Sequence, residues 1–345
     1  MRKHIHHIHI IIIASVLILV IGFIAFNTYL ENLYSGDPVT FGVSFSPNYA
    51  RELGLNPEQT FISLLNLGVK TFRLSAYWDE IEPFNSALDK PFYFEDLDWY
   101  IDEADNRGAK VILAVGYKLP RWPECRAPEW LNDTRHPGLD PGSLSYLRQR
   151  QLKMVEVVIN YYNDNPAVNA FQIENEPLLA FGHCPGTDRE FFYNELNLVR
   201  SISKKPIILT DTGELRSWVT PMQNSDIFGT TIYKKVHNKF FGDLYYPIPP
   251  WFYRYKSILI RKFLAPNNEK TIIAELQSEP WANQSITSLP IDEQTKRYSL
   301  KELKDTVEFA KKTSFSEIYF WGVEWWYYLA ANGHPEYLEY TKTLF

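Results

Sequence analysis

Short apolar runs alternate with longer amphipathic segments from residue 39 to the end of the chain. Most of the apolar runs show no alternation with polar residues, which is typical of strands buried on both faces of a parallel sheet. Eight runs have the length and the aromatic and β-branched content expected of such strands: 39–45, 69–74, 110–115, 168–173, 206–209, 227–232, 271–274 and 317–321.

The segments between these runs have helical spacing and carry helix start signals. Asn56 and Pro57 form an N-cap and first-turn pair before one helix. Asp188 can cap another helix, and Ser299 with Glu302 fits a capping box. The chain therefore predicts a regular succession of strands and helices.

Eight β/α units in about 300 residues predict a single (β/α)₈ barrel, the TIM-barrel fold, within the α/β class. The alternative is an open, doubly wound sheet, which would carry a glycine-rich phosphate turn after its first strand. Here that segment reads SFSPNYARELG. We see no linker after residue 39 that would separate a second domain.

The N-terminal segment differs from the rest of the chain. Residues 10–26 contain no charge, and Arg2, Lys3 and four histidines precede them. The run is longer than a usual cleavable signal and close to the length of a spanning helix, although a cleaved signal is an alternative. Following the positive-inside rule, we expect a cytoplasmic basic, His-rich head (1–9), a transmembrane signal anchor (10–27), a stalk (28–38) and an extracytoplasmic barrel domain (39–345).

Composition narrows the function classes. The net charge is −6 and the basic residues are scattered, so we expect no nucleic-acid partner. The chain holds 10 Trp, 22 Tyr and 22 Phe, which could build either a bulky core or platforms for sugar rings. The spacing of Cys125 and Cys184 fits no metal site, and in neighbouring loops of an exported barrel they could form a disulfide.

In a barrel of this type, functional residues lie where strands end. Glu176 follows the fourth predicted strand and Glu275 follows the seventh. Two carboxyl groups facing each other across the mouth match the requirement of a retaining glycosidase, which places them roughly 5–5.5 Å apart. Two other glutamates compete with this pair. We expect Glu174 to be a buried structural carboxylate deeper in the barrel, and Glu279 is a rival nucleophile in the following loop.

A motif and four further residues lie at the predicted strand ends: Asn175-Glu176-Pro177, Arg73, Tyr233, Glu275 and Trp321. In this set the chain resembles the retaining glycoside hydrolases of clan A, with family 5, the cellulase-like family, as the nearest type. The resemblance implies that Glu176 is the acid/base and Glu275 the nucleophile.

The resemblance also implies roles for the neighbouring residues. Arg73 would orient the nucleophile and Tyr233 would donate a hydrogen bond to it. Asn175 would bind the 2-hydroxyl of the sugar, and Trp321 would form the floor of the sugar site. The chain departs from family 5 in having no histidine in AVGYKLP after the third strand or just before Tyr233, so the substrate stays open.

Further aromatic residues could also contact a glycan. Trp122 and Trp281 are candidate sugar platforms, with ordinary packing as the alternative, and Glu324 could contact sugar or form a salt bridge at the rim. Residues 239–263 are rich in aromatic and basic side chains. They could form a cleft loop and a barrel helix, or a patch that rests on the membrane.

These features predict a retaining hydrolase that cleaves the O-glycosidic bonds of a β-linked glycan by double displacement. Two carboxyl groups and water suffice for that reaction, so we expect no metal and no organic cofactor. The expected partners are an oligo- or polysaccharide and the membrane, and we expect a monomer. A transglycosylase and a catalytically silent glycan-binding barrel are the alternatives.

Overall fold

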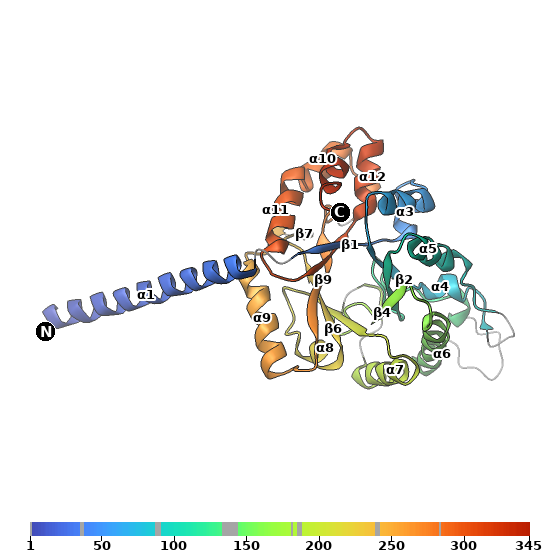
Figure 1. Ribbon diagram of the computed structural model, residues 1–345, viewed down its shortest axis with the longest axis horizontal. Helices are drawn as coiled ribbons and strands as arrows, with labels where there is room; N and C mark the ends of the chain where they lie inside the picture. Colours follow the sequence, from blue (N-terminus) through green and yellow to red (C-terminus); the bar gives the residue numbers. More distant parts are fainter. Residues whose placement is uncertain are drawn as a thin grey trace.

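The computed structural model describes residues 2–34, 38–86, 91–132, 144–180, 182–184, 188–238, 242–282 and 284–345. Eight parallel strands close into a barrel in the order β1-β10-β9-β6-β5-β4-β3-β2 (Figure 1). These strands are β1 (Thr40–Ser44), β2 (Thr71–Ser75), β3 (Lys110–Val115), β4 (Val168–Ile173), β5 (Ile207–Asp211), β6 (Ile227–Ile232), β9 (Lys270–Gln277) and β10 (Glu317–Trp321). The predicted (β/α)₈ barrel is confirmed.

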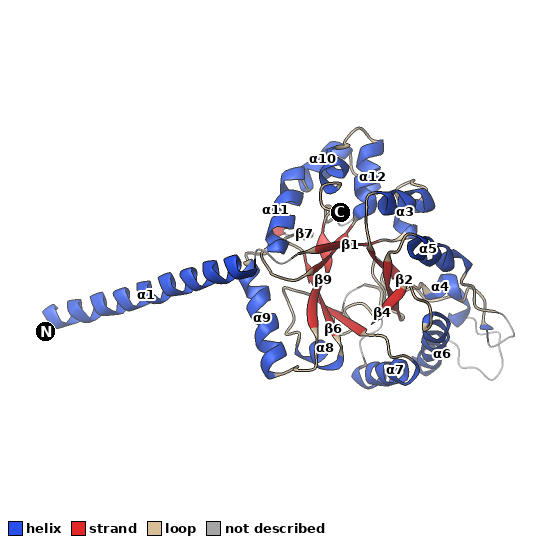
Figure 2. Ribbon diagram, viewed as in Figure 1, coloured by secondary structure: helices blue, strands red, loops and turns tan. Residues whose placement is uncertain are grey.

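Helices surround the barrel, as the ring of blue ribbons around the red strands in Figure 2 shows. They are α2 (Pro47–Glu52), α3 (Pro57–Asn66), α4 (Trp78–Ile81), α5 (Glu95–Asn106), α6 (Leu144–Tyr162), α7 (Arg189–Ile202), α8 (Val219–Asn224), α9 (Pro250–Phe263), α10 (Ile291–Arg297), α11 (Leu300–Lys311), α12 (Val323–Ala331) and α13 (Glu336–Thr341), with 3₁₀ turns at Glu129–Asn132 and Ile286–Ser288. The predicted caps are present, since Asn56 and Asp188 accept from backbone N–H groups and Ser299 with Glu302 forms the capping box.

Each predicted apolar run overlaps one of the eight strands, with ends that differ by at most three residues. The seventh prediction, 271–274, ended too early because β9 continues to Gln277. The apolar pattern breaks at Glu275 and Gln277, whose side chains make polar contacts at the mouth of the barrel. Glu275 therefore lies within the strand rather than after it, and the strand backbone fixes its position.

Aromatic residues fill much of the layer between the barrel and its helices. Phe61 of α3 packs against Phe72 of β2 at 4.5 Å between ring centroids and against Tyr100 of α5 at 5.2 Å. Trp218 and Trp325 are completely buried. A large part of the aromatic content therefore serves packing, in agreement with the first of the two interpretations of composition.

The loop after β6 contains a two-stranded hairpin that the sequence pattern did not predict. It consists of β7 (Lys235–Asn238) and β8 (Gly242–Tyr245), paired antiparallel, and residues 239–241 between them lie outside the described residues. Helix α9 follows, as predicted for the second half of 239–263. Each strand of the hairpin has four residues. A strand this short cannot be distinguished from a loop by the pattern of apolar and polar residues.

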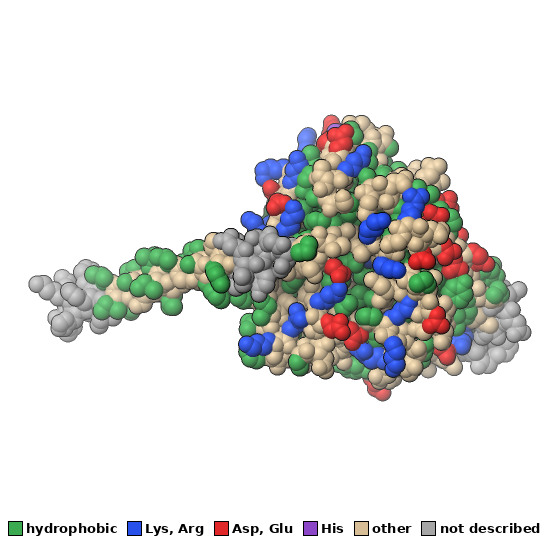
Figure 3. All heavy atoms as spheres, in the orientation of Figure 1, with side chains coloured by type: hydrophobic (Ala, Val, Ile, Leu, Met, Phe, Trp, Pro, Cys, Tyr) green, Lys and Arg blue, Asp and Glu red, His purple; other side chains and the backbone are tan. Residues whose placement is uncertain are grey.

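An N-terminal helix, α1 (Arg2–Tyr34), projects from the barrel as a separate rod (Figure 1). Hydrophobic side chains lie along its exposed surface (Figure 3). The helix continues through residues 28–34, so the first part of the predicted stalk is helical, and residues 35–37 lie outside the described residues. Continuous helical hydrogen bonding from the apolar segment explains why no break occurs at residue 28.

Candidate active site

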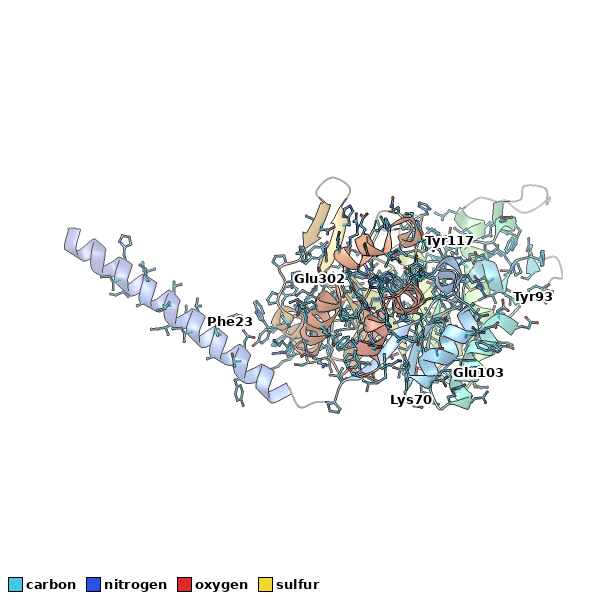
Figure 4. The ribbon with its side chains drawn as sticks, turned by 90° about the horizontal axis from the view of Figure 1, so that it is seen from above. Phe23, Lys70, Tyr93, Glu103, Tyr117 and Glu302 are labelled. Atoms are coloured by element: carbon cyan, nitrogen blue, oxygen red, sulfur yellow. A yellow bond between two sulfur atoms is a disulfide. The ribbon has the colours of Figure 1, made fainter. Side chains whose placement is uncertain are left out.

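The carboxyl ends of the barrel strands meet at one end of the molecule. Figure 4 shows Tyr117, which follows β3, at that end, and Lys70, which precedes β2, at the opposite end. Glu176 and Glu275 are both buried there. Thr231 of β6 joins them, because it pairs with Glu275 in the strand register and its hydroxyl donates to Glu176 Oε1 at 3.2 Å.

Both carboxylate oxygens of Glu275 accept hydrogen bonds. Arg73 Nη1 donates to Oε1 at 2.8 Å, and the Tyr233 hydroxyl donates to Oε2 at 2.7 Å. The first contact is also a salt bridge between two buried side chains. A guanidinium on one oxygen and a phenol on the other fix the orientation of the carboxylate. The structure therefore brings Arg73, Tyr233 and Glu275 together, as the resemblance implied.

Arg73 uses its remaining donors to order the end of β4. Its Nε donates to Gln172 Oε1 at 2.7 Å, and its Nη2 donates to Asn175 Oδ1 at 2.8 Å. Since the amide oxygen of Asn175 is held in this way, its amide nitrogen is the group that can donate to a ligand. The contribution of Gln172 was missed in the sequence, although a polar residue inside an apolar strand was the available signal.

Glu176 has electrostatic surroundings that differ from those of Glu275. Burial raises its pKa well above the usual range, and the negative charges of Glu275 and Glu124 raise it further. The hydroxyl of Thr231 is its hydrogen-bond donor within the described residues. Two neighbouring carboxyl groups in such different surroundings can hold one proton between them, with Glu176 as the protonated member.

The backbone after β4 turns sharply and separates Glu174 from Glu176. Both residues have a positive φ, 57° for Glu174 and 44° for Glu176. The Glu174 carboxylate accepts from the backbone N–H groups of Tyr117 and Lys118 at 2.8 and 2.6 Å and from Gln151 of α6 at 2.7 Å. It is buried, as expected, but it lies between the β3 loop and the helix layer rather than deeper in the barrel. The left-handed turn breaks the strand alternation on which that expectation depended.

Lys118 supports the main chain that carries Glu176. Its Nζ donates to the carbonyl oxygens of Glu176 at 3.1 Å and Leu179 at 2.9 Å, and it forms a salt bridge of 3.1 Å with Glu124. Burial raises the pKa of Glu124 to about 7, although Lys118 lowers it. The loops after β3 and β4 are also joined by a disulfide between Cys125 and Cys184. The wall of the mouth beside Glu176 is therefore held covalently.

A second ionic cluster lies beside Trp321. Arg121 Nη1 donates to Glu279 Oε1 at 2.6 Å, and Arg121 Nη2 lies 3.5 Å from Glu324 Oε2. The guanidinium also lies over the Trp321 ring, 4.4 Å from its centroid, and over the Tyr49 ring at 3.4 Å. One face of Trp321 is therefore covered by Arg121. Glu279, the rival nucleophile, is paired with this arginine.

A small cavity opens between the two clusters. Its wall is formed by Ser44, Phe45, Ser46, Arg73, Ser75, Tyr77, Pro120, Arg121 and Trp321. Within the described part of the chain, Arg121 Nε and Glu279 Oε2 have no hydrogen-bond partner although both are buried. Such atoms are candidates to contact a polar ligand, since burial without a partner is unfavourable.

The two candidate platforms lie in different surroundings. Trp281 meets the Tyr233 ring edge-on at 5.1 Å, beside Glu275. Trp122 is 62% exposed and meets His183 edge-on at 4.7 Å. Trp281 is thus next to the catalytic candidates, and Trp122 lies on the outer part of the mouth, on the β3 loop.

Comparisons with known proteins agree with the barrel fold. The family model of glycoside hydrolase family 42, described as beta-galactosidase, matches residues 56–222. That segment includes Arg73, Asn175 and Glu176 and ends before Glu275. The matched family belongs to clan A of the glycoside hydrolases. A comparison with curated protein sequences found no match.

The closed barrel and the matched segment make this chain similar to the glycoside hydrolases of clan A. The resemblance to family 5 holds at the level of the clan, because the matching sequence model is that of family 42.

Solved structures show the same barrel. The barrel is similar to a beta-galactosidase from the psychrophilic Marinomonas ef1, with 16% identity and a TM-score of 0.55 over 82% of this chain and 54% of that one. It is also similar to a family 5, subfamily 18 protein from Bifidobacterium longum subsp. infantis, with 14% identity and a TM-score of 0.55 over 82% and 69%. The chain thus spans about half the length of the beta-galactosidases that it matches.

Several residues of the site carried no recognised sequence signal. Thr210 accepts from the Glu176 N–H at 2.9 Å, and Thr231 and Lys118 contact the same residue. Threonine is common in buried strands. Only the contact across the barrel identifies these residues as part of the site.

Proposed function

We propose that the chain is a retaining glycoside hydrolase that cleaves the O-glycosidic bonds of a β-linked glycan by double displacement. The observation that carries the proposal is the asymmetry between the two carboxyl groups. Glu275 accepts hydrogen bonds from Arg73 and Tyr233 on its two oxygens, whereas the neighbouring Glu176 has a raised pKa. This is the division between nucleophile and acid that the reaction requires.

In the first step a Glu275 oxygen attacks the anomeric carbon and the bond to the leaving oxygen breaks. Glu176 gives its proton to that oxygen, so the leaving group departs neutral. In the second step Glu176, now ionised, takes a proton from water, and the water oxygen displaces Glu275 from the anomeric carbon. The same carboxyl group thus acts as acid and then as base, and the anomeric configuration is retained.

Asn175 and the Arg121 cluster would bind the sugar. The Asn175 amide nitrogen can donate to the 2-hydroxyl, since Arg73 occupies the amide oxygen. Trp281 would provide an apolar surface beside Glu275, and Arg121 with Glu279 would offer a donor and an acceptor to further hydroxyl groups. We expect the substrate to be an oligo- or polysaccharide. The family 42 model and the solved clan A structures support this expectation, because they include proteins described as beta-galactosidases.

The catalytic domain, residues 39–345, is proposed to be held outside the cytoplasm by α1. This helix contains a candidate span, His9–Tyr29, with a mean hydropathy of 2.9. Arg2 and Lys3 before the span favour a cytoplasmic N-terminus. A cleaved signal sequence would satisfy the same composition. Recovery of the full chain in a carbonate-washed membrane fraction, with residues 1–9 still present, would distinguish the anchor from it.

The catalytic assignment is tested by chemical rescue on an activated aryl β-glycoside. We expect Glu275→Ala to lose turnover by at least about a thousandfold, a transition-state cost of ~4 kcal/mol. Azide should partly restore release of the aryl group and yield a glycosyl azide of inverted configuration. Glu279→Ala is the matched control, because Glu279 is also a buried glutamate paired with an arginine.

Each outcome of this test is informative. Rescue of Glu279→Ala rather than Glu275→Ala would move the nucleophile to the rival residue. Absence of turnover in the wild-type chain across a panel of activated glycosides and polysaccharides, with glycan binding intact, would favour the silent binding barrel. An inverted sugar product from the wild-type chain would exclude double displacement.

A further inference from the structure

We propose that one face of α9 lies on the surface of the lipid bilayer that α1 crosses, so that the barrel rests on the membrane. This inference rests on the proposed role of α1 as an anchor. The face is the α9 stripe, which we define as Trp251, Tyr255, Leu259 and Phe263. The two interpretations of residues 239–263 are then both met, because the helix in that segment is a barrel helix whose outer side would face lipid.

The α9 stripe begins in contact with α1. Phe23 of α1 meets the ring of Trp251 edge-on at 5.0 Å, and Phe26 stacks on Tyr255 at 6.3 Å. Figure 4 shows Phe23 on the part of α1 that approaches the barrel. The anchor and the barrel are therefore in direct contact through α9, rather than separated by the length of a stalk.

The position of these contacts along α1 determines how deep in the bilayer they would lie. The candidate span His9–Tyr29 has 21 residues. At a rise of 1.5 Å per residue it is about 31 Å long, which matches the ~30 Å hydrocarbon layer of a bilayer. Phe23 and Phe26 lie within roughly 9 Å of its barrel-side end by the same rise. Trp251 and Tyr255 would then lie at the membrane–water interface, where tryptophan and tyrosine are enriched.

The stripe continues beyond the contact with α1 as an uncovered apolar surface. Its four residues follow one another at intervals of four, so they lie along one side of the helix. Leu259 is 53% exposed and Phe263 is 66% exposed. The opposite side of α9 is buried against the barrel through Tyr253, Arg254, Ser257 and Ile260. The stripe is thus a row of apolar side chains that begins at α1 and then becomes exposed. Such a row is suited to insertion between lipids.

Charge on α9 agrees with a lipid headgroup layer. The helix contains no Asp or Glu, and its last turn carries Arg261 and Lys262. Lys262 is exposed, next to Phe263 of the stripe. Arg254 and Lys256 point to the barrel, where they donate to backbone carbonyl groups. A basic residue at the edge of an apolar surface would contact the phosphate groups of the lipids.

The test places a single spin label at defined sites of the full chain in liposomes of phosphatidylcholine with phosphatidylglycerol. The only two cysteines in the sequence form the disulfide, so an introduced cysteine is the single free thiol. Leu259→Cys and Phe263→Cys report on the stripe, and Leu19→Cys reports on the span. Phe84→Cys is the matched control, since Phe84 is 55% exposed and contacts Tyr93 on the side of the barrel away from α1 (Figure 4).

Electron paramagnetic resonance compares the accessibility of each label to oxygen, which enters lipid, with that to a water-soluble nickel chelate. We expect the ratio of oxygen to chelate accessibility at residues 259 and 263 to exceed that at residue 84 severalfold and to lie below that at residue 19. All four positions are exposed, so the core is unchanged, and circular dichroism checks the fold of each variant.

The possible failures are distinguishable. If residue 19 is in lipid but residues 259 and 263 match residue 84, the inference is wrong and the anchor stands. If residue 19 also matches residue 84, the proposed anchor itself is wrong. If residues 259 and 263 are shielded from both reagents and their spectra broaden by spin–spin coupling that dilution with unlabelled chain removes, the stripe contacts a second copy of the chain instead.

Discussion

Arg73 connects more of the candidate site than any other side chain described here. It reaches Gln172, Asn175 and Glu275 with three different nitrogens, at 2.7 to 2.8 Å. A lysine could not serve all three, because its charge sits on a single nitrogen and lacks the planar fork of the guanidinium. The residue is almost completely buried, so its charge depends on Glu275 for compensation.

The Tyr233 hydroxyl provides a test of how Glu275 is held. Tyr233→Phe removes one hydrogen bond to a charged group, a loss of about 1.5–3 kcal/mol, or roughly 10- to 150-fold. We expect kcat/KM on an activated aryl β-glycoside to fall by that factor. Tyr162→Phe is the control, because its hydroxyl donates to Asp98 at 2.8 Å in a pair between α6 and α5, outside the Glu176–Glu275 site. Equal losses of kcat/KM in the two variants would show that the hydrogen bond to Glu275 has no particular role in catalysis.

Glu324 gives a prediction about pH and stability. Burial raises its pKa from 4.5 to about 7, although Arg121 lowers it. Between those values the folded chain holds a proton that the unfolded chain has lost, so this residue's contribution to stability is complete below pH 4.5 and is lost as pH rises through 7. The Glu324→Gln variant keeps the size and shape of the side chain but has no carboxyl group that can ionise.

We therefore expect wild type to lose free energy of unfolding relative to Glu324→Gln as pH rises from 4.5 to above 7. A shift of this size corresponds to at most about 3 kcal/mol. Urea unfolding of both proteins across this range measures the difference. A difference that does not change with pH would show that Glu324 ionises at the same pH in the folded and unfolded chains.

At the scale of elements, the loops after β3 and β4 depend on each other. The disulfide between Cys125 and Cys184 closes a segment with a sequence separation of 59 residues. Lys118 bridges the same two loops through the carbonyl oxygens of Glu176 and Leu179. Both features hold the chain that carries the acid candidate.

Removal of the disulfide should lower stability. We expect Cys125→Ser combined with Cys184→Ser to lose about 2–4 kcal/mol of unfolding free energy, since the unfolded chain gains conformational freedom. Urea unfolding measures this loss, and wild type unfolded in the presence of a reductant should match the double variant. Unchanged unfolding in both cases would mean that the bond does not constrain the unfolded chain.

For the whole molecule, the arrangement of the strands in the barrel is what creates the candidate site. Arg73 lies on β2, Glu176 follows β4, Tyr233 follows β6 and Glu275 lies on β9, so no two of them share a β/α unit. The Arg73–Glu275 contact joins β2 to β9 across β1 and β10, whose pairing completes the circle. The contact of α1 with α9 then sets how this barrel would stand on a membrane, which is the basis of the inference about the α9 stripe.

The sequence by itself determined the eight strands, several helix caps and the placement of Glu176 and Glu275 on or next to two of the strands, because apolar runs and capping residues are set by residues close together in the chain. It could not determine the end of β9, the direction of Glu174, the Arg121 cluster or the contact between α1 and α9. These depend on pairs such as Arg121 with Glu279, 158 residues apart. Whether Glu275 and Glu176 were neighbours was likewise decided only by the tertiary structure, since only the folded barrel brings polar groups of different strands together.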